Sequence, residues 1–291
     1  MCIRDSGYVS TNPRVQVAAG IGLDRPAELP DEMDVLIVGS GPAGMIAAAQ
    51  LAMFPDVHTR IIERRPHRLE IGQADGIQAR SVETFQAFGF ASEIIDEAFD
   101  LTSMAFWNPA EDDADTIVRT SLAEDDPEGV SEFPHLIVNQ ARILDWFAEY
   151  MKNSPTRARP DYGWAFETLE DTNDGEHPVL VTLRRTVDAE GNALEDPASG
   201  PTRQVRAKYV VGADGAGSRV RKAIGHTLTG DAANHAWGVM DALADTDFPD
   251  IRTKCAIHSS SGSILLIPRE GGHLFRICLL YTSPSPRDKR Q

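Results

Sequence analysis

The sequence has little cysteine and no long apolar run. Its 291 residues include three cysteines, which follow no spacing typical of a disulfide framework or of a Cys/His metal site. No apolar stretch approaches the length of a membrane-spanning helix, and no signal peptide is recognisable. These absences predict a protein of a reduced, cytoplasmic setting, with no bound metal and no segment in a membrane.

Basic residues are scarce relative to acidic ones. Lys and Arg total 28 against 44 Asp and Glu, a net charge of −16 at pH 7. This balance argues against nucleic acid and anionic membrane as partners, because both attract clustered positive charge. An anionic small molecule can still bind wherever a pocket is locally basic.

Both ends of the sequence resemble a translated sequencing adapter. Residues 1–6 can be written ATG TGT ATA AGA GAC AG, and the reverse complement of that string encodes Cys-Leu-Leu-Tyr-Thr, which stands at residues 278–282. We therefore expect residues 1–6 and 278–291 to be adapter-derived and the natural part to be about 7–277, cut at both ends. The two ends hold four of the 28 basic and two of the 44 acidic residues. The natural part therefore has 24 basic and 42 acidic residues and is still strongly acidic.

A glycine-rich turn follows an apolar, β-branched run at residues 35–38 and precedes an Ala-rich helical segment that reaches Leu51. Strand, tight turn and helix in this order are typical of a dinucleotide-binding unit. The glycines permit the turn, the approach of a pyrophosphate and close helix–strand packing, and the helix N-terminus favours the phosphate charge. The candidate cofactor-binding residues here are Gly39, Gly41, Pro42, Ala43 and Gly44.

An acidic residue ends the next predicted strand. Glu63 closes the run 59–63, nineteen residues after Gly44, where a dinucleotide-binding unit holds a ribose hydroxyl. The pattern therefore predicts an adenine dinucleotide site. Arg64 is a further candidate for the cofactor, although Arg64 and Arg65 can equally be a solvated basic pair.

Two glycines flank Asp75 in the run Gly72-Gln-Ala-Asp-Gly76, which predicts a close approach of the backbone to a ligand. The spacing alone leaves two interpretations of Asp75, a turn or capping aspartate and a base or hydrogen-bond acceptor. Ser81 is within reach of capping the helix that follows, which we expect to extend to about Gly89.

Later segments predict further strands and helices. A second strand, glycine turn and helix stands at residues 205–221, with Asp214 at the end of the strand, where it can add to the same ligand crevice. Residues 111–128 read as a solvated acidic loop or the end of a hairpin, and strands after residue 230 read as an antiparallel sheet. We expect an α/β fold, with a Rossmann-like βαβ domain interleaved with an antiparallel β-sheet substrate domain.

At this point the sequence resembles the single-component FAD-dependent aromatic hydroxylases, which are built like 4-hydroxybenzoate hydroxylase. The turn 39–44 with Glu63, and the run Gly212-Ala-Asp214-Gly215, resemble motifs of that group. Narrower runs are similar to its phenol 2-monooxygenase branch, and within it to hydroxylases of 3-hydroxybenzoate. These runs are 72–76, 131–135, 230–241, 248–251 and 267–270.

The resemblance implies a reaction and its participants. NADPH would reduce bound FAD, O2 would form a flavin C4a-hydroperoxide, and its terminal oxygen would pass to a phenolic ring. It implies 4-hydroxylation of 3-hydroxybenzoate, with phenol as the alternative substrate. A different flavin enzyme, such as an epoxidase or halogenase, is a rival, and the halogenase Trp-x-Trp-x-Ile-Pro run is absent. The resemblance also implies a homodimer.

Residue roles follow from the resemblance. Asp75 would increase the phenolate character of the substrate. Arg269 would stabilise a reduced flavin or a developing anion, or else be an ion-paired arginine at a strand end. Gly72, Gln73, Gln140, Arg142 and Asp214 would contact FAD.

A substrate carboxylate needs a cation or donor in a buried pocket. Lys254 and His135 are the candidates, with a solvated lysine and a structural histidine as alternatives. Trp107, Trp237 and Phe106 are expected in the core rather than at the substrate.

The sequence departs from the family pattern where a tyrosine that touches substrate and flavin would stand, because position 278 is Cys. A later Gly-Asp motif and a thioredoxin-like domain are absent, so a non-catalytic FAD-binding fragment is an alternative. We expect an FAD-binding domain at 33–105 and 203–230, preceded by an arm at 7–32. The rest, with the substrate domain, would be 106–202 and 231–277.

Overall fold

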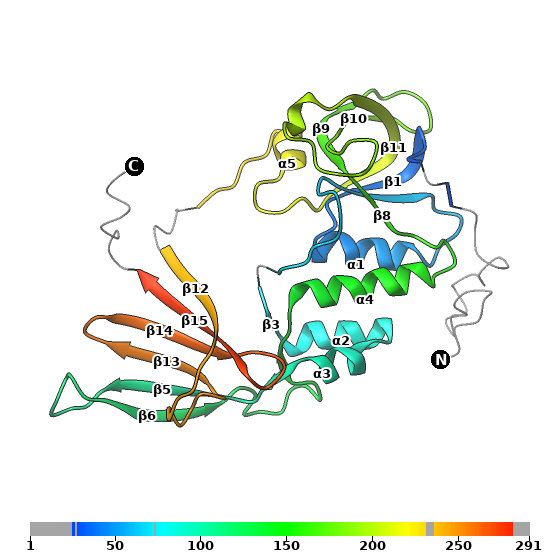
Figure 1. Cartoon of the computed structure of the whole chain (residues 1–291). Helices are drawn as coiled ribbons and strands as arrows, with labels where there is room; N and C mark the ends of the chain where they lie inside the picture. The colour runs from blue at the N-terminus through cyan, green and yellow to red at the C-terminus, as the bar shows by residue number, and fades with distance from the viewer. Residues whose placement is uncertain (1–24, 27, 73, 231–235, 282–291) are drawn as a thin grey trace, which may run out of the picture. The chain divides into compact units, whose positions relative to one another are not determined.

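The computed structural model describes residues 25–26, 28–72, 74–230 and 236–281. The chain forms two compact units, one from residues 1–70 and 143–229 and the other from residues 71–142 and 230–291. Each unit is thus built from two separate stretches of sequence, as the predicted interleaving requires. The predicted mixed α/β architecture is confirmed (Figure 1).

The first unit contains a six-stranded sheet. Its order is β8-β2-β1-β11-β10-β9, and β1 pairs in parallel with both β2 and β11. The predicted βαβ unit is β1, α1 and β2. The bounds are β1 Glu32–Val38, α1 Pro42–Leu51, β2 Thr59–Glu63, β8 Pro160–Tyr162, β9 Trp164–Asp171, β10 Val179–Arg185 and β11 Thr202–Gly212. The short helix α5 (Arg219–Ala223) and the 3-10 turn Pro197–Ser199 belong to this unit as well.

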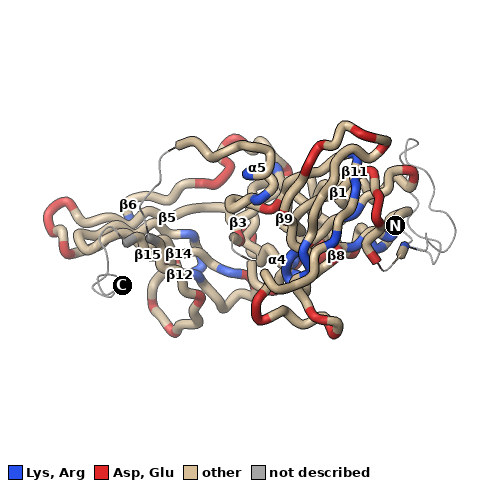
Figure 2. Tube along the Cα trace, turned by 90° about the horizontal axis from the view of Figure 1, so that it is seen from above, with Lys and Arg blue, Asp and Glu red and all other residues tan. Residues whose placement is uncertain are grey.

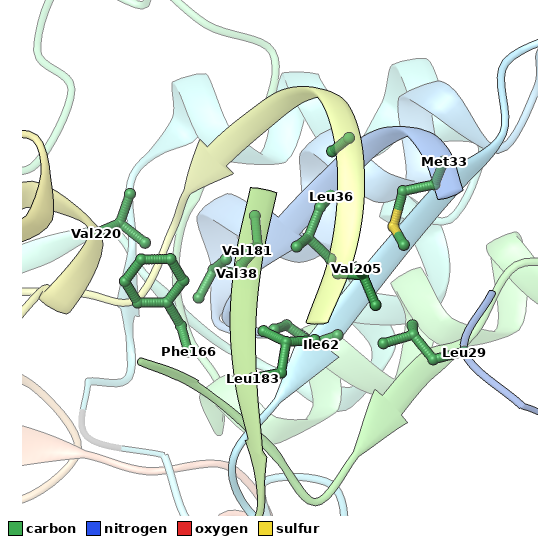
Figure 3. Packing of buried hydrophobic residues seen from close by; sticks show 11 residues of the cluster. Leu29, Met33, Leu36, Val38, Ile62, Phe166, Val181, Leu183, Val205 and Val220 are labelled. Carbon is green, nitrogen blue, oxygen red and sulfur yellow. The ribbon is translucent and has the colours of Figure 1, made fainter. Parts of the chain in front are cut away.

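Apolar side chains from β1, β2, β9, β10 and β11 form the core of the first unit (Figure 3). Leu36 and Ile62 are fully buried, as expected of central strands in a parallel arrangement. Leu29 belongs to this core although it was expected in a loose arm, while residues 7–24 of that arm lie outside the described part.

The second unit contains a six-stranded sheet of order β12-β15-β14-β13-β5-β6. It is antiparallel except that β5 and β13 run in parallel. The bounds are β5 Ser103–Pro109, β6 Ile117–Glu124, β12 Ala236–Leu243, β13 Lys254–Ser259, β14 Gly262–Pro268 and β15 Leu274–Tyr281. A small sheet contains β3 (Gly76–Ile77), β7 (His135–Ile137) and β4 (Phe99–Leu101), with helices α2 (Ala79–Phe88) and α3 (Ala91–Glu97). Helix α4 (Gln140–Lys152) begins in this unit and continues into the first.

The six-stranded sheet of the second unit has one packed face. Ala105, Cys255, Leu266 and Phe275 are buried there, and Trp107 and Phe248 pack against them with ring centroids 5.0 Å apart. Because side chains alternate along a strand, the residues between these positions lie on the opposite face. That opposite face carries the candidate site described below.

Several local predictions differ from the structure. Helix α2 begins after Gln78, and Ser81 lies inside it, so Ser81 is not its cap. Of the expected acidic segment, residues 111–115 connect β5 with β6, which agrees with a hairpin end, whereas residues 117–124 form β6 rather than a loop (Figure 2). Trp237 is 54% exposed rather than buried in a core.

The division of the chain also differs from the predicted bounds. Strands β8 to β10, expected with the substrate domain, join the sheet of β1 because β10 pairs with β11 and β8 with β2. Residues 278–281, set aside above as adapter-derived, form the end of β15 and pair with β12 and β14. Strand pairing uses backbone groups, so it tolerates many sequences. Residues 1–6 and 282–291 lie outside the described part.

Candidate functional site

The carboxyl ends of three parallel strands meet beside the glycine turn of the first unit. The amide of Gly39, after β1, donates to the carbonyl of Ile62 in β2 at 2.8 Å. The amide of Ala213, after β11, donates to the carbonyl of Val38 at 2.8 Å. Ligands of open α/β sheets bind outside such strand ends. The second glycine motif begins at Gly212, 168 residues after Gly44 (212 − 44), and the pairing of β11 with β1 places it beside the first motif.

Two of the predicted glycines are required by close packing. Gly39 has φ of +102°, and a Cβ there would lie 2.6 Å from the carbonyl oxygen of Ala213. A Cβ at Gly44 would lie 1.9 Å from the carbonyl oxygen of Gly39. Gly41 differs, because a Cβ there would meet no atom within 4 Å.

The N-terminus of α1 fits a phosphate group. Gly41 is the N-cap, Pro42 is the first helical residue, and no side chain caps the helix. The open space beside Gly41 adjoins these N–H groups and the positive end of the helix dipole. The turn 39–44 can therefore hold the pyrophosphate of a dinucleotide.

Glu63 is buried, with 5% of its surface exposed, and it links the turn to the residues after β2. Its Oε2 accepts from the amide of Ser40 at 3.1 Å and from the hydroxyl of Ser40 at 2.9 Å. Its Oε1 accepts from the amide and Nε of Arg65 at 3.0 and 3.1 Å. Burial opposes the charged form, but the bonds from Arg65 and Ser40 outweigh it and lower the pKa of Glu63.

Ser40 and Arg65 were missed by the sequence reasoning, which singled out Arg64. The side chain of Arg64 is exposed and pairs with no residue in the described part of the chain. Arg65, the next residue, forms the ion pair with Glu63 at 3.1 Å. In the sequence, only the position of Glu63 at the end of β2 indicated that a basic residue such as Arg65 could pair with it.

Asp214 stands beside the glycine turn, but its carboxylate is engaged within its own loop. Oδ1 accepts from the hydroxyl of Ser218 at 2.5 Å, and Oδ2 accepts from the amide of Arg219 at 2.6 Å. Asp214 thus holds the start of α5, and its Cα would lie 3.0 Å from a Cβ at Gly39. Its predicted contact with FAD stays a prediction.

Two other predicted cofactor residues adjoin each other in the second unit. A Cβ at Gly72 would lie 2.5 Å from the Cβ of Gln140, so only glycine fits there. Asn139, which was not predicted, accepts from the amides of Gly72 at 3.2 Å and Ala141 at 2.9 Å and so ties this loop to the start of α4. Arg142 is ion-paired with Glu97 at 2.7 Å. Gln73 lies outside the described residues.

Asp75 lies in a buried cluster of charged residues of the second unit. Its Oδ2 accepts from Nη1 of Arg269 at 2.7 Å and also from Nη1 of Arg276. Both Asp75 and Arg269 have less than a tenth of their surface exposed. Asp75 thus forms ion pairs with two arginines, and Arg269 is an ion-paired arginine at the end of β14. The roles of both residues toward a substrate or flavin stay predictions.

The two arginines have acidic partners of their own. Arg269 donates from Nε and Nη2 to Glu270 at 3.0 and 2.8 Å. Arg276 donates from Nε and Nη2 to Asp241 at 2.7 and 2.9 Å. Two arginines thus meet three carboxylates.

Burial and these contacts shift the protonation of the cluster. Burial raises the pKa of Asp75, while the two guanidinium groups oppose the shift and the neighbouring carboxylates add to it. The hydrogen bonds from Arg276 lower the pKa of Asp241. Arg276 and Asp241 were not singled out from the sequence, because nothing in their spacing shows that β12 and β15 pair at these residues.

Lys254 lies on the same face of the sheet as Arg276. Cys255 pairs with Leu266, so Lys254 is in register with Ile267, which pairs with Arg276, which in turn pairs with Asp241. Residues opposite each other in neighbouring strands point to the same face. One strand separates Lys254 from Arg276, a spacing of about 10 Å. The ammonium group of Lys254 has no partner among the described residues.

His135 is buried on β7, next to the strand that follows Asp75. Its Nδ1 is 3.2 Å from Oδ1 of Asp125, and a Cβ at Gly76 would lie 3.4 Å from its Nε2. The amide of Val138 donates to the carbonyl of Asp75 at 2.9 Å, so the two strands are joined at this point. Whether His135 meets a substrate stays a prediction.

No group of three or more His, Cys, Asp or Glu residues in the described part is arranged to hold a metal ion. Among the helices of residues 25–26, 28–72, 74–230 and 236–281, none is long and apolar enough to cross a membrane.

Comparison with known proteins places these features in context. A family model described as FAD binding domain matches residues 32–291. A 3-hydroxybenzoate 4-monooxygenase of Comamonas testosteroni is 47% identical over 272 residues, which are 93% of this chain and 41% of the relative. A phenol 2-monooxygenase of Aspergillus fumigatus is 31% identical over 242 residues, 82% of this chain and 37% of the relative. The chain thus spans about two fifths of the length of these relatives.

A solved structure shares the fold. The flavin-dependent monooxygenase PieE, crystallised with FAD and substrate, matches with a TM-score of 0.69 at 19% identity. The match covers 90% of this chain and 46% of that one.

Proposed function

The chain belongs to the FAD binding domain family, and we propose that it binds FAD through the glycine turn and Glu63. We propose further that it carries the part of an aromatic monooxygenase that binds the hydroxyl group of the substrate. The amides at the start of α1 would hold the pyrophosphate, and Glu63 would accept from the adenosine ribose. Bound FAD, reduced by NADPH, supplies the activation of O2. Ser40 and Arg65 hold Glu63 in place for this contact.

One observation supports the hydroxylation of a phenolic acid. Asp75 presents a carboxylate whose Oδ2 is held by two arginines, on the sheet face that also carries the unpaired Lys254. A hydroxyl of the substrate can donate to Asp75, which increases the electron density of the ring, while Lys254 attracts a carboxylate on the same ring. The similarity to a 3-hydroxybenzoate 4-monooxygenase makes 3-hydroxybenzoate, hydroxylated at position 4, the proposed substrate.

Phenol is the second candidate, because a phenol 2-monooxygenase is among the relatives. Phenol has a hydroxyl for Asp75 but no carboxylate for Lys254. Given the length of the relatives, a chain that retains FAD without turnover is the alternative from another class. A homodimer and a cytoplasmic setting remain predictions.

The test compares ligands and variants in parallel. We expect FAD fluorescence to be quenched on binding, and 3-hydroxybenzoate to bind more tightly than phenol. Lys254→Met should remove that difference and leave the affinity for phenol unchanged. Equal affinity of the unsubstituted chain for both ligands would contradict the carboxylate role of Lys254, and no retention of FAD would contradict the proposal as a whole.

A turnover experiment distinguishes a catalytic chain from one that binds FAD without reaction. NADPH oxidation and product formation would be followed for this chain and for a longer chain of the length of its relatives. FAD binding without product in the shorter chain, together with product in the longer one, would identify this chain as the binding part. NADPH oxidation without any hydroxylated product in the longer chain would contradict the proposed substrates.

A further inference from the structure

The guanidinium group of Arg276 is held by two carboxylates, those of Asp241 and Asp75. Two of its nitrogens donate to the two carboxylate oxygens of Asp241, at 2.7 and 2.9 Å, across the pair of strands β12 and β15. This side-by-side arrangement sets the plane of the guanidinium group. The remaining nitrogen, Nη1, is directed at Asp75.

Arg269 and Arg276 act on the same oxygen of Asp75. Arg269 is 4% exposed and is committed to Glu270 through Nε and Nη2, so only its Nη1 reaches Asp75 Oδ2. No described residue donates to Oδ1 of Asp75. A carboxylate held by one oxygen keeps the lone pairs of the other for a ligand.

The charges around Asp75 do not balance. The groups that face it are Arg269 and Glu270 after β14, Arg276 on β15 and Asp241 on β12. His135 on β7 adjoins Gly76 and is engaged by Asp125. With every carboxylate ionised, the two arginines leave one negative charge in excess. The protonation of Asp75 therefore depends on the guanidinium group of Arg276 and on the carboxylate of Asp241 that holds it.

We propose that Arg276, anchored by Asp241, is a positioning residue that fixes the orientation and the charge of Asp75, so that Oδ1 is presented to the hydroxyl of a phenolic ligand. The effect on Asp75 stands on the geometry of the second unit alone. The identity of the ligand rests on the function proposed above.

The first test measures Asp75 without any cofactor. Carboxyl-labelled aspartate in the full chain is titrated by 13C NMR, and the Asp75 signal is assigned by its loss in Asp75→Asn. We expect Arg276→Met to raise the pKa of Asp75 by roughly 1 unit or more, because a cation is lost. Asp241→Asn should lower that pKa, because a neighbouring negative charge is lost while Arg276 remains.

Shifts of opposite sign distinguish this role from general loosening of the sheet. Arg276→Lys should bring the pKa of Asp75 back toward the unsubstituted value, and it serves if Arg276→Met fails to fold. Arg252→Met is the matched control, because Arg252 donates to the carbonyls of Leu274 and Arg269 in the same hairpin but to no carboxylate among the described residues. Shifts of the same sign in Arg276→Met and Asp241→Asn, or no shift in either, would overturn the proposal, as would a shift in Arg276→Lys as large as that in Arg276→Met.

The second test uses ligands. The ratio of affinities for 3-hydroxybenzoate and benzoate reports the hydroxyl contact, and we expect Arg276→Met to reduce this ratio by about tenfold, a change of about 1.4 kcal/mol. The affinity for benzoate itself should not change. An unchanged ratio would contradict the role of Arg276 in presenting Oδ1. If neither acid binds the unsubstituted chain, the proposed function fails, and the NMR shifts still decide the effect on Asp75.

Discussion

Gly39 lies so close to Ala213 that the turn after β1 and the turn after β11 have no room for a side chain between them. A Cβ on Gly39 would be 2.6 Å from the carbonyl oxygen of Ala213 and 3.0 Å from the Cα of Asp214. The two glycine motifs of the sequence therefore form one packed edge of the first unit. The close contact makes Gly39 a structural requirement of that edge as well as a part of the proposed cofactor site.

Gly39→Ala should destabilise the first unit, whereas Gly41→Ala should not. At Gly39 the positive φ of +102° alone costs on the order of 1–3 kcal/mol, and the contact with Ala213 adds to it. At Gly41 the added methyl meets no atom within 4 Å, so folding is unaffected but the methyl occupies the space proposed for the pyrophosphate. Urea unfolding followed by circular dichroism, with FAD titration by fluorescence, checks both. A Gly41→Ala chain that binds FAD as well as the unsubstituted chain would place the pyrophosphate elsewhere.

Glu63→Gln should lower the free energy of unfolding by about 1.5–3 kcal/mol at pH 7, because a buried carboxylate with charged and backbone donors is lost. The pKa of Glu63 is lowered in the folded chain, so its contribution is present above the ordinary glutamate pKa and is lost as the pH falls through the folded value. The difference between Glu63→Gln and the unsubstituted chain should therefore shrink below about pH 4. Urea unfolding at pH 7 and in acid measures this difference, and a constant gap would contradict the ionised role of Glu63.

Cys255 should be unreactive in the folded chain. Its side chain is fully buried and donates toward the carbonyl of Thr253 at 3.2 Å, and burial raises the pKa of its thiol to about 11. Burial also raises the pKa of Cys278. The thiols therefore remain protonated at pH 8, where the thiolate is the reactive form. With Cys2 replaced by serine, a colorimetric thiol reagent should label neither cysteine at pH 8 within minutes and both after unfolding in urea. Rapid labelling of Cys255 before unfolding would show that the packed face of the sheet opens.

The free side of β12 should promote association between chains. Among the described strands, β12 pairs only with β15, and it exposes Trp237 at 54% and Val239 at 56%. Exposed apolar edge strands pair with other chains, and a lysine on such an edge opposes that pairing. Val239→Lys should lower the average mass in sedimentation experiments. Ile224→Lys, which adds the same charge to a residue 54% exposed after α5, is the control. Equal behaviour of the two variants would exclude the β12 edge as the associating surface.

The sequence indicated the elements around the cofactor turn because their signals are local. An apolar run before glycines, an Ala-rich helix after them and an acid at the end of the next strand all lie within residues 34–63, and β1, α1 and β2 follow that order. The fold class and the flavin-dependent family were predicted from these elements together with the later runs that resemble the family, and both are confirmed. The helix start at Ser81 was wrong, because Gln78 already has the extended backbone of an N-cap.

The charged cluster was only half predicted. Asp75 and Arg269 were singled out through the family resemblance, but their contact joins residues 194 positions apart. Arg276 and Asp241 gave no signal, because an arginine and an aspartate on exposed-looking strands are common in any sheet. Their pairing depends on the register of β12 and β15, which the side-chain pattern of either strand alone does not set.

By itself the sequence determined the elements whose causes are local: the glycine turn, the strand and helix around it, and the acid that follows. The tertiary structure alone decided which oxygen of Asp75 is held, that Ser40 and Arg65 share Glu63, and that Lys254 faces the same side as Arg276. Local propensities act over a few residues along the chain, whereas hydrogen bonds and ion pairs between distant strands depend on sheet register. That register is fixed only when the apolar faces of all the strands are buried together.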